Sequence, residues 1–279
     1  MNVRAATDED IEAFVVLANV TGWSYESADA ERLLRLFPDG FFACEEDGVP
    51  TGFATALGFG KTGIVGNVVV DSRLRKGGRG KALVGACVAH LKDSGASDIR
   101  LYAYENVVGF YERLGFIPGA GFLTMKAKAG LACRGHAAVV LDDSLLKKSI
   151  GLDREVFGGD RTRFIKALRG EFPDLALAIA DGESLDGYVL ARGSASTGYE
   201  AGPWVATGAG GASLLDALMG RVEEGSDFWV TVPEGNSEAM AAVKRLGFKK
   251  AFKTVEMALG AKPPSLDARV FALCGLEKG

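Results

Sequence analysis

The apolar residues of this 279-residue chain recur at two spacings, about two residues in some segments and about 3.6 in others. The run Val68–Val70 is short, bounded and β-branched, which is typical of a strand buried on both faces. From Ala82 to Leu91 the apolar residues recur at helical spacing, and Gly95 ends the segment. The pattern therefore predicts a strand, a loop and a helix in succession.

The first half of the chain predicts the order strand, two helices, hairpin, strand, helix, strand, short helix and strand. The ranges are a strand at 3–5, a helix through 11–18, a helix around 33–36 that ends before Pro38, a hairpin of 41–44 and 51–57, the strand 68–70, the helix up to 95, a strand at 99–103, a helix at 107–114 and a strand at 122–125.

The second half repeats this outline. A hairpin is expected at 175–191, a central strand at 198–206, a helix at 214–222, a strand at 228–232 and a helix at 236–248. Leu-Gly-Phe at 114–116 recurs as Leu-Gly-Phe at 246–248, and such self-similarity indicates a duplicated domain. We predict domains at 1–128 and 146–279, joined by a connecting segment at 129–145. Residues 268–274 predict one more strand, to which the sequence assigns no place.

Composition narrows the class of protein. The chain is 48% apolar and 24% charged, close to the average for globular proteins. A net charge of −4 argues against general nucleic-acid binding. No apolar run approaches a membrane span, and the four cysteines and two histidines form no C-x-x-C or zinc pattern. We expect a cytoplasmic monomer or homodimer that binds no metal, nucleic acid or membrane.

The loop between the strand and the helix is basic and rich in glycine. Its cations and glycines are Arg73, Arg75, Lys76, Gly77, Gly78, Arg79, Gly80 and Lys81. The first N–H groups of a helix have no intrahelical partner and attract anions, and glycine lets a ligand approach the backbone closely. A Walker loop does not fit, because Ala82 follows Gly80-Lys81, and the glycine spacing does not fit a dinucleotide fingerprint. The loop therefore predicts a phosphate site, with a solvated basic turn or a nucleic-acid patch as the alternative.

Two motifs carry a family resemblance. Arg75-x-x-Gly78-x-Gly80 resembles the pyrophosphate signature R/Q-x-x-G-x-G/A of the GNAT superfamily of acyl-CoA-dependent N-acetyltransferases, and Phe110–Phe116 resembles its Y-E-K-L-G-F segment. The resemblance covers nearly the whole chain. It implies an α/β fold (an α+β mixed sheet) of tandem domains, each a mostly antiparallel sheet with a splayed central strand pair and flanking helices.

The same resemblance implies acetyl-CoA as co-substrate. Its binding residues would be Val68, Val69, Val70, Arg75, Lys76, Gly77, Gly78, Arg79, Gly80 and Lys81. One departure concerns an asparagine that, in many members, precedes the tyrosine of the closing segment by seven residues. Here Asn106 precedes Tyr111 by five, so we assign Asn106 no cofactor contact.

The second half lacks this chemistry. Thr207–Ala212 keeps glycines but has no Arg, Lys or Gln, and Val243 stands in the place of Tyr111. It resembles the degenerate C-terminal domain of certain bacterial two-domain GNAT proteins.

Acetyl transfer needs a bound thioester, an uncharged amine, an oxyanion donor and a proton for the leaving thiolate. The resemblance gives Tyr111 the role of acid, since a phenol with a pKa of about 10 is protonated at neutral pH and can donate to a thiolate whose thiol has a pKa of about 8.5. A backbone N–H near Val69 would bind the oxyanion if a bulge, suggested by Gly66, frees it. Glu105 is the candidate base. Because no His–Cys or Ser–His pairing offers a covalent route, direct attack in a ternary complex is expected.

The acceptor is expected opposite the CoA, among Trp23, Tyr25, Asn67, Tyr104 and Glu105. Aromatic rings and a carboxylate suit a small ammonium compound, such as a polyamine, an amino acid or an amino sugar. The alternatives are that Trp23 and Tyr25 only pack between helices, that the acceptor is a protein, that the protein is a non-catalytic acyl-CoA sensor, and that the basic loop binds RNA.

Overall fold

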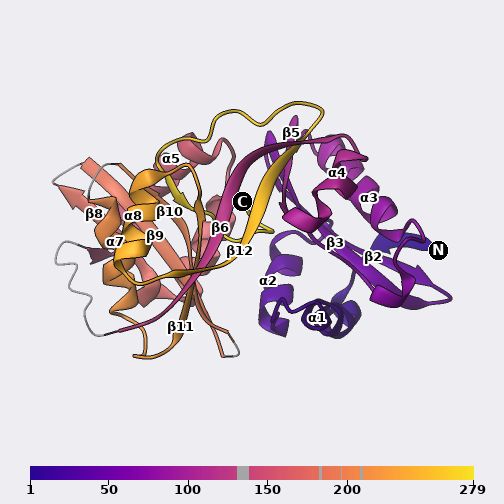
Figure 1. Ribbon diagram of the computed structural model, residues 1–279, viewed down its shortest axis with the longest axis horizontal. Coiled ribbons are helices and arrows are strands. Elements are labelled where there is room, and N and C mark those ends of the chain that lie inside the picture. Colours follow the sequence, from indigo (N-terminus) through magenta and orange to yellow (C-terminus); the bar gives the residue numbers. More distant parts are fainter. Residues whose placement is uncertain (131–137, 182–183, 196, 208–209) are drawn as a thin grey trace. The chain divides into compact units, whose positions relative to one another are not determined.

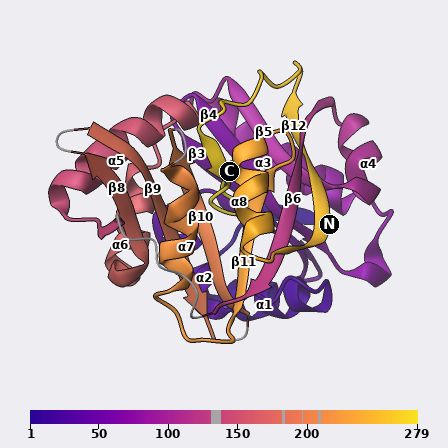
Figure 2. The same cartoon turned by 60° about the vertical axis from the view of Figure 1, so that its left-hand side comes forward.

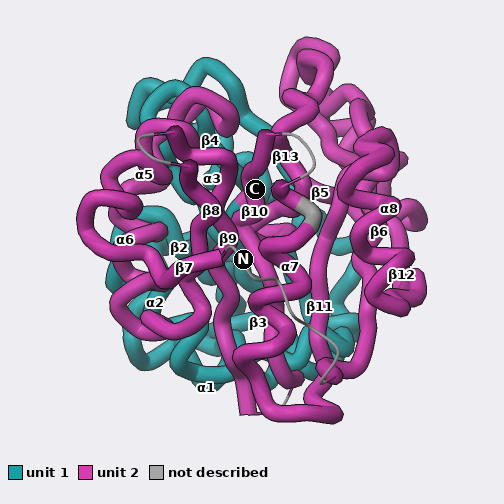
Figure 3. The backbone as a smooth tube through the Cα atoms, turned by 90° about the vertical axis from the view of Figure 1, so that its left-hand side faces the viewer, with its two compact units in different colours: residues 1–101, 278 teal, residues 102–277, 279 magenta. Residues whose placement is uncertain are grey.

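The computed structural model describes residues 1–130, 138–181, 184–195, 197–207 and 210–279 (Figure 1). By its contacts the chain forms two compact units: unit 1 is residues 1–101 with Lys278, and unit 2 is residues 102–277 with Gly279 (Figure 3). No helix in the described ranges is both long and apolar enough to cross a membrane. Cys133, His136 and part of the segment Thr207–Ala212 lie outside the described residues.

Unit 1 holds five strands and three helices in the predicted order. They are β1 (Asn2–Ala5), α1 (Ile11–Val20), α2 (Ser27–Leu36), β2 (Phe41–Glu46), β3 (Val49–Phe59), β4 (Thr62–Val70), α3 (Arg79–Asp93) and the first part of β5 (Asp98–Tyr104). β4 starts at Thr62 and is longer than the predicted strand at 68–70. The prediction missed its first part because Gly63 and Gly66 interrupt the apolar pattern. Gly63 allows close packing of α3 on this strand, because a Cβ atom at this position would lie 2.8 Å from the Leu91 side chain.

The sheet of unit 1 has the strand order β1-β2-β3-β4-β5 and helices on both faces. Neighbouring residues of one strand point to opposite faces. Phe41 of β2 contacts Phe14 of α1, with ring centroids 5.0 Å apart, whereas the next residue, Phe42, contacts His90 of α3. α1 and α3 therefore cover opposite faces.

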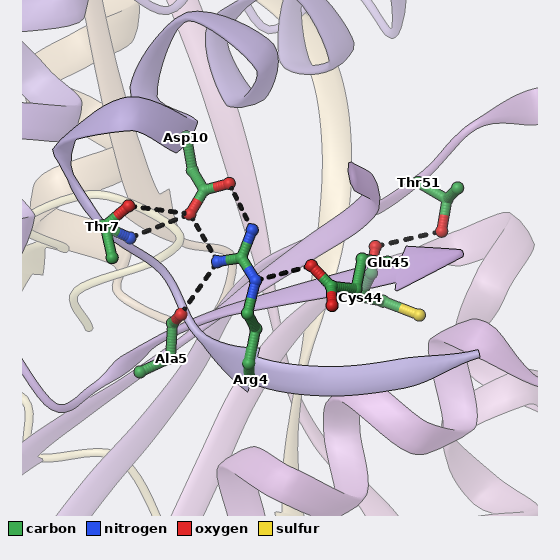
Figure 4. Close-up of polar contacts among 7 residues, drawn as sticks. All are labelled: Arg4, Ala5, Thr7, Asp10, Cys44, Glu45 and Thr51. Carbon is green, nitrogen blue, oxygen red and sulfur yellow. Dashed lines mark hydrogen bonds and ion pairs between the residues drawn. The ribbon is translucent and has the colours of Figure 1, made fainter. Parts of the chain in front are cut away.

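Arg4 joins the first strand to its neighbours (Figure 4). Its Nε atom donates to Glu45 of β2 at 2.7 Å, and its Nη1 atom donates to Asp10 at 2.7 Å. Asp10 also accepts from the Thr7 backbone N–H at 2.9 Å, which caps the 3₁₀ turn Asp8–Asp10 before α1. The hydrogen bond from Arg4 is the main reason that the pKa of Asp10 is lowered. This network fixes the register of β1 at the sheet edge.

Unit 2 holds the rest of the chain. Its elements are α4 (Val108–Glu112), β6 (Phe116–Lys128), β7 (Val139–Val140), α5 (Asp143–Phe157), α6 (Thr162–Glu171), β8 (Ala176–Asp181), β9 (Ser184–Ser194), β10 (Gly198–Ala206), α7 (Gly211–Met219), β11 (Asp227–Pro233), α8 (Ser237–Arg245), β12 (Lys249–Leu259) and β13 (Val270–Ala272). From α5 to β12 the order of elements repeats that from α1 to β6, apart from short 3₁₀ turns. This repetition confirms the predicted tandem arrangement.

β6 pairs with strands of the second half of the sequence. It lies between β11 and β12 and is antiparallel to both, as the magenta, orange and yellow ribbons show in Figures 1 and 2. Met125 pairs with Val230 on one side, and Leu123 pairs with Lys253 on the other. The boundary of the compact units therefore falls after Leu101, before β6 rather than after it, because the two halves of the sequence share this part of the sheet. The predicted domains 1–128 and 146–279 follow the duplication of the sequence rather than the contacts that define the compact units. Their boundaries remain a prediction.

Candidate functional site

β4 and β5 separate along their length. Their parallel pairing joins Thr62–Ile64 to Asp98–Arg100 and ends there, although β4 continues to Val70. From Val65 onward, the edge of β4 that faced β5 therefore keeps backbone donors and acceptors that β5 does not use. The predicted splay of the central strands is confirmed.

A β-bulge interrupts the other edge of β4. The pairing with β3 shifts between Gly66 and Val69, where Asn67 and Val68 stand opposite a single residue. Asn67 has a φ of 51°, and its buried side-chain amide donates to Thr55 Oγ1 at 3.3 Å. The bulge follows directly after Gly66, the residue that suggested it. Because Asn67 is buried, its side chain offers an acceptor little accessible surface.

The loop after β4 begins with a carboxylate cap. Asp71 accepts from the Arg73 backbone N–H at 2.9 Å and forms an ion pair with the Arg73 guanidinium at 2.6 Å. These bonds, led by the side-chain hydrogen bond, lower the pKa of Asp71 to about 2. Asp71 is therefore ionised at every pH near neutrality, and it compensates Arg73.

Arg79 is turned into the loop. Its guanidinium pairs with Glu46 of β2 and donates to the Leu74 carbonyl at 3.2 Å, and the side chain is only 11% exposed. A Cβ atom on Gly77 would lie 2.3 Å from Arg79 Nη1, so the glycine makes room for the guanidinium. The sequence predicted Arg79 as one of several phosphate ligands, whereas in the structure its side chain contacts Glu46 and the Leu74 carbonyl within the protein.

Three cationic side chains of the loop are exposed to solvent. Arg75, Lys76 and Lys81 are exposed, and none forms an ion pair within the described ranges. Gly78, with a φ of 81°, precedes α3, whose first helical hydrogen bond runs from Ala82 N to Gly78 O. The preceding N–H groups of the first turn lack an intrahelical partner. Unpaired cations beside a helix N-terminus form a site for a polyanion.

Tyr111 lies on α4 in unit 2. Its ring is 9% exposed and makes edge contacts with Phe110 and Phe116, with centroids 4.9 and 6.0 Å apart. Gly115 ends the segment with a φ of 88°, which glycine adopts without strain. Gly247 ends the equivalent segment of the second half with a φ of 79°. The repeated Leu-Gly-Phe therefore forms the same helix stop twice.

Tyr104 and Glu105 lie beside β12. The Tyr104 ring contacts Phe252, with centroids 5.2 Å apart, and Glu105 Oε1 is 4.0 Å from Lys253 Nζ. Sequence reasoning missed both partners, because it assigned no strand to residues 249–259. The alternating apolar residues Val255, Met257 and Leu259 were the available signal.

The two aromatic residues after α1 differ in exposure. Trp23 is half-buried. Tyr25 is buried with its ring against Phe14, with centroids 5.1 Å apart, and the Asn19 side chain binds its backbone N–H and carbonyl at 2.6 and 3.0 Å. The packing alternative therefore fits Tyr25, and Trp23 is the more accessible of the two.

The comparable region of the second half is occupied by the chain itself. β10 pairs in parallel with β11 only from Tyr199 to Ala201, and further along it pairs with β13. Leu273 N also donates to Thr231 O of β11 at 3.0 Å. β13 therefore lies between the diverging parts of β10 and β11, which gives a place to the segment that the sequence left unassigned.

Comparisons with known proteins agree with this geometry. Residues 7–116 match a family described as "Acetyltransferase (GNAT) family", and residues 150–272 match an "Acetyltransferase (GNAT) domain". A crystal structure from Pyrococcus horikoshii covers 100% of this chain and 95% of its own with a TM-score of 0.82 at 19% identity. A GCN5-related N-acetyltransferase from Sphaerobacter thermophilus covers 96% and 98% with a TM-score of 0.70 at 17% identity.

Two sequence relatives differ in how much of the chain they match. Serotonin N-acetyltransferase 2, chloroplastic, of Oryza sativa subsp. japonica is 36% identical over 121 residues, which are 40% of this chain and 59% of the rice protein. The uncharacterized N-acetyltransferase YitH of Bacillus subtilis is 22% identical over 98% of this chain and 96% of its own length. The chain belongs to the GNAT superfamily of acetyltransferases, with two GNAT domains in tandem.

Proposed function

We propose that the protein transfers an acetyl group from acetyl-CoA to a primary amine of a small molecule, by direct attack within a ternary complex. The observation that carries the proposal is strand β4, which is bulged along β3 and left unpaired by β5 beyond Ile64, and which leads into a helix N-terminus with three uncompensated cations. Among the residues that the structure describes, the first half combines these features and the second half does not.

The donor would bind along β4 and α3. Arg75, Lys76 and Lys81 would contact the pyrophosphate together with the N–H groups of the first turn of α3. The backbone of Val68–Val70 would bind the pantetheine arm, as the family resemblance implies. The side chain of Arg79 would hold the loop in shape.

The proposed acetyl transfer would use three groups of the protein. A backbone N–H at the bulge would bind the oxyanion, Tyr111 would protonate the leaving thiolate, and Glu105 would attract the acceptor ammonium and take its proton directly or through water. The thiols of Cys44, Cys87 and Cys274 are buried, and burial raises the pKa of Cys87, which suits direct attack better than a covalent thioester.

A small amine is favoured over a protein as acceptor. The name of the rice relative, which is 36% identical over 121 residues, specifies a small amine. An acyl-CoA sensor and a protein acetyltransferase remain the competing proposals.

Release of free thiol from acetyl-CoA tests the proposal. The protein is mixed with acetyl-CoA and, in separate reactions, with small amines and with peptides that have free N-termini or lysines. We expect thiol release with one or more small amines. No release with any acceptor while CoA binds would indicate a sensor, and release with peptides alone would indicate a protein acetyltransferase.

Replacement of Tyr111 tests the proposed acid. Tyr111→Phe should lower turnover by about 10²–10³-fold, because the leaving thiolate loses its proton donor, while CoA affinity stays near normal. Tyr199→Phe is the matched control, since it removes a hydroxyl from a ring of unit 2 that stacks on Phe228. Unchanged turnover in Tyr111→Phe, with chemistry rate-limiting, would rule out the acid role.

A further inference from the structure

Three charged side chains from separate segments of unit 2 meet at one point. Lys253 of β12 places its Nζ atom 2.8 Å from Glu234 Oε2 and 4.0 Å from Glu105 Oε1. Glu234 follows β11, and Glu105 follows β5. The Lys253 ammonium therefore lies near two carboxylates, at hydrogen-bond distance from Glu234 and farther from Glu105.

The backbone makes room for this arrangement. Gly121 of β6 accepts a hydrogen bond from Glu234 N at 2.9 Å, and a Cβ atom on Gly121 would lie 2.6 Å from Glu234 Oε2 and 3.1 Å from Lys253 Cε. The hydrogen bond to Glu234 is the main reason that the pKa of Lys253 is raised. Lys253 is therefore a fixed cation at neutral pH.

The two carboxylates differ in what they offer a ligand. Glu234 has its ammonium partner at hydrogen-bond distance, whereas Glu105 is farther from that ammonium and is 61% exposed. The paired rings of Tyr104 and Phe252 lie on the neighbouring positions of the same two segments. An amine that approaches these rings would meet Glu105 as its carboxylate, with the Lys253 ammonium 4.0 Å from one oxygen of that carboxylate.

We propose that Lys253 is a specificity-determining residue, which limits the positive charge of the acceptor and selects amines with a single ammonium group over polyamines. With Lys253 the three side chains carry a net charge of −1, which one ammonium balances. Without it the net charge is −2, so a second ammonium on the acceptor also gains attraction. The inference rests on the proposed function, since it places the acceptor ammonium at Glu105.

The experiment compares amines of matched length with one, two and three ammonium groups. In Lys253→Met we expect the KM to fall by about threefold for the monoamine and by about tenfold or more for the triamine, with larger changes at low ionic strength. Lys253→Arg should restore the wild-type order of the three amines. Lys250→Met is the matched control, because Lys250 is an exposed lysine of the same strand without an ion pair among the described residues.

A second variant should act in the opposite direction. Glu234→Gln removes the nearer carboxylate and leaves the Lys253 ammonium to Glu105, so the KM of every amine should rise. A purely structural role for the pair would instead change the KM in the same direction in both variants, independent of acceptor charge and of salt, and that result would overturn the inference.

Failure of the proposed function can be recognised separately. If the wild-type protein releases no thiol with any amine, the same amine series is measured by calorimetry on the wild type and on Lys253→Met. Charge-dependent tightening in the variant would still support the role of Lys253 in amine binding. Absence of any charge dependence would contradict it.

Discussion

β4 of unit 1 and β10 of unit 2 occupy equivalent positions in the two halves of the chain. They differ in what pairs with the edge that faces the next parallel strand. The edge of β4 beyond Ile64 is left open by β5, whereas the edge of β10 beyond Ala201 is paired with β13. The loop after β4 carries three uncompensated cations, and the loop after β10 carries none in its sequence. The same topology can therefore hold a ligand in one half and a segment of its own chain in the other.

Asn236 strengthens this comparison. Its side-chain amide donates to the carbonyl oxygens of Ala268 and Val270 at 2.9 and 2.8 Å, so it binds the backbone that leads into β13. Asn236 precedes Val243 by seven residues, which is the spacing that many family members have between asparagine and tyrosine. The second half thus keeps the asparagine without the tyrosine, and the first half keeps Tyr111 without an asparagine at that spacing.

The largest effect is expected from removal of the three open cations. Arg75→Ala with Lys76→Ala and Lys81→Ala should weaken acetyl-CoA binding by about 10²–10⁴-fold, because each charge-assisted contact to phosphate contributes roughly 1.5–3 kcal/mol and the contacts are not additive. Calorimetry measures both the affinity and the stoichiometry, which should be one CoA per chain in the wild type.

A matched triple variant provides the control. Lys244, Lys249 and Lys250 are three exposed lysines of the second half, and their replacement by alanine changes the net charge by the same amount. CoA affinity should hardly change. Two CoA sites per chain in the wild type, or equal losses in the two triple variants, would contradict the comparison of the halves.

A smaller effect is expected from a change at the contact of β10 with the chain that fills its edge. A Cβ atom on Gly202 would lie 1.7 Å from the Leu273 carbonyl oxygen, so Gly202→Ala must displace this segment. We expect a loss of about 1–3 kcal/mol in the free energy of unfolding, the usual range for overpacking. Denaturant unfolding measures it, with Gly151→Ala of α5 as control, since a Cβ atom there meets nothing within 4 Å.

The same variant separates two reasons for the lack of a second CoA site. If the absence of cations excludes the ligand, Gly202→Ala still binds one CoA per chain. If β13 alone excludes it, loosening β13 should create a second, weaker site.

Local chemistry could be predicted from the sequence, and long-range pairing could not. The strand, the bulge after Gly66 and the helix N-terminus at Gly78 depend on neighbouring residues, so their pattern was visible. The position of β6 between β11 and β12 depends on which distant strand supplies the better partner, and the sequence holds no local record of that choice.

The same limit applies to individual side chains of the site. Arg79 and Arg75 are arginines of the same loop, and the Arg79 guanidinium differs in its contacts with Glu46 of a distant strand and with the Leu74 carbonyl. Lys253 of β12 lies 4.0 Å from Glu105, which follows β5, and no spacing along the chain predicts this contact.

The smallest effect is expected from the guanidinium that braces the loop. Arg79→Ala removes the contacts to Glu46 and to the Leu74 carbonyl, so the free loop gains conformations that must be lost again when CoA binds. We expect about a three- to tenfold loss of CoA affinity, with a weaker salt dependence than in Arg75→Ala, because the Arg79 charge is paired with Glu46. Arg75→Ala, in contrast, removes a charge that faces the ligand, and its effect should shrink as ionic strength rises. Titrations of both variants at low and high salt make the distinction. A salt dependence in Arg79→Ala as steep as that in Arg75→Ala would show that the Arg79 side chain leaves Glu46 and contacts the phosphates directly.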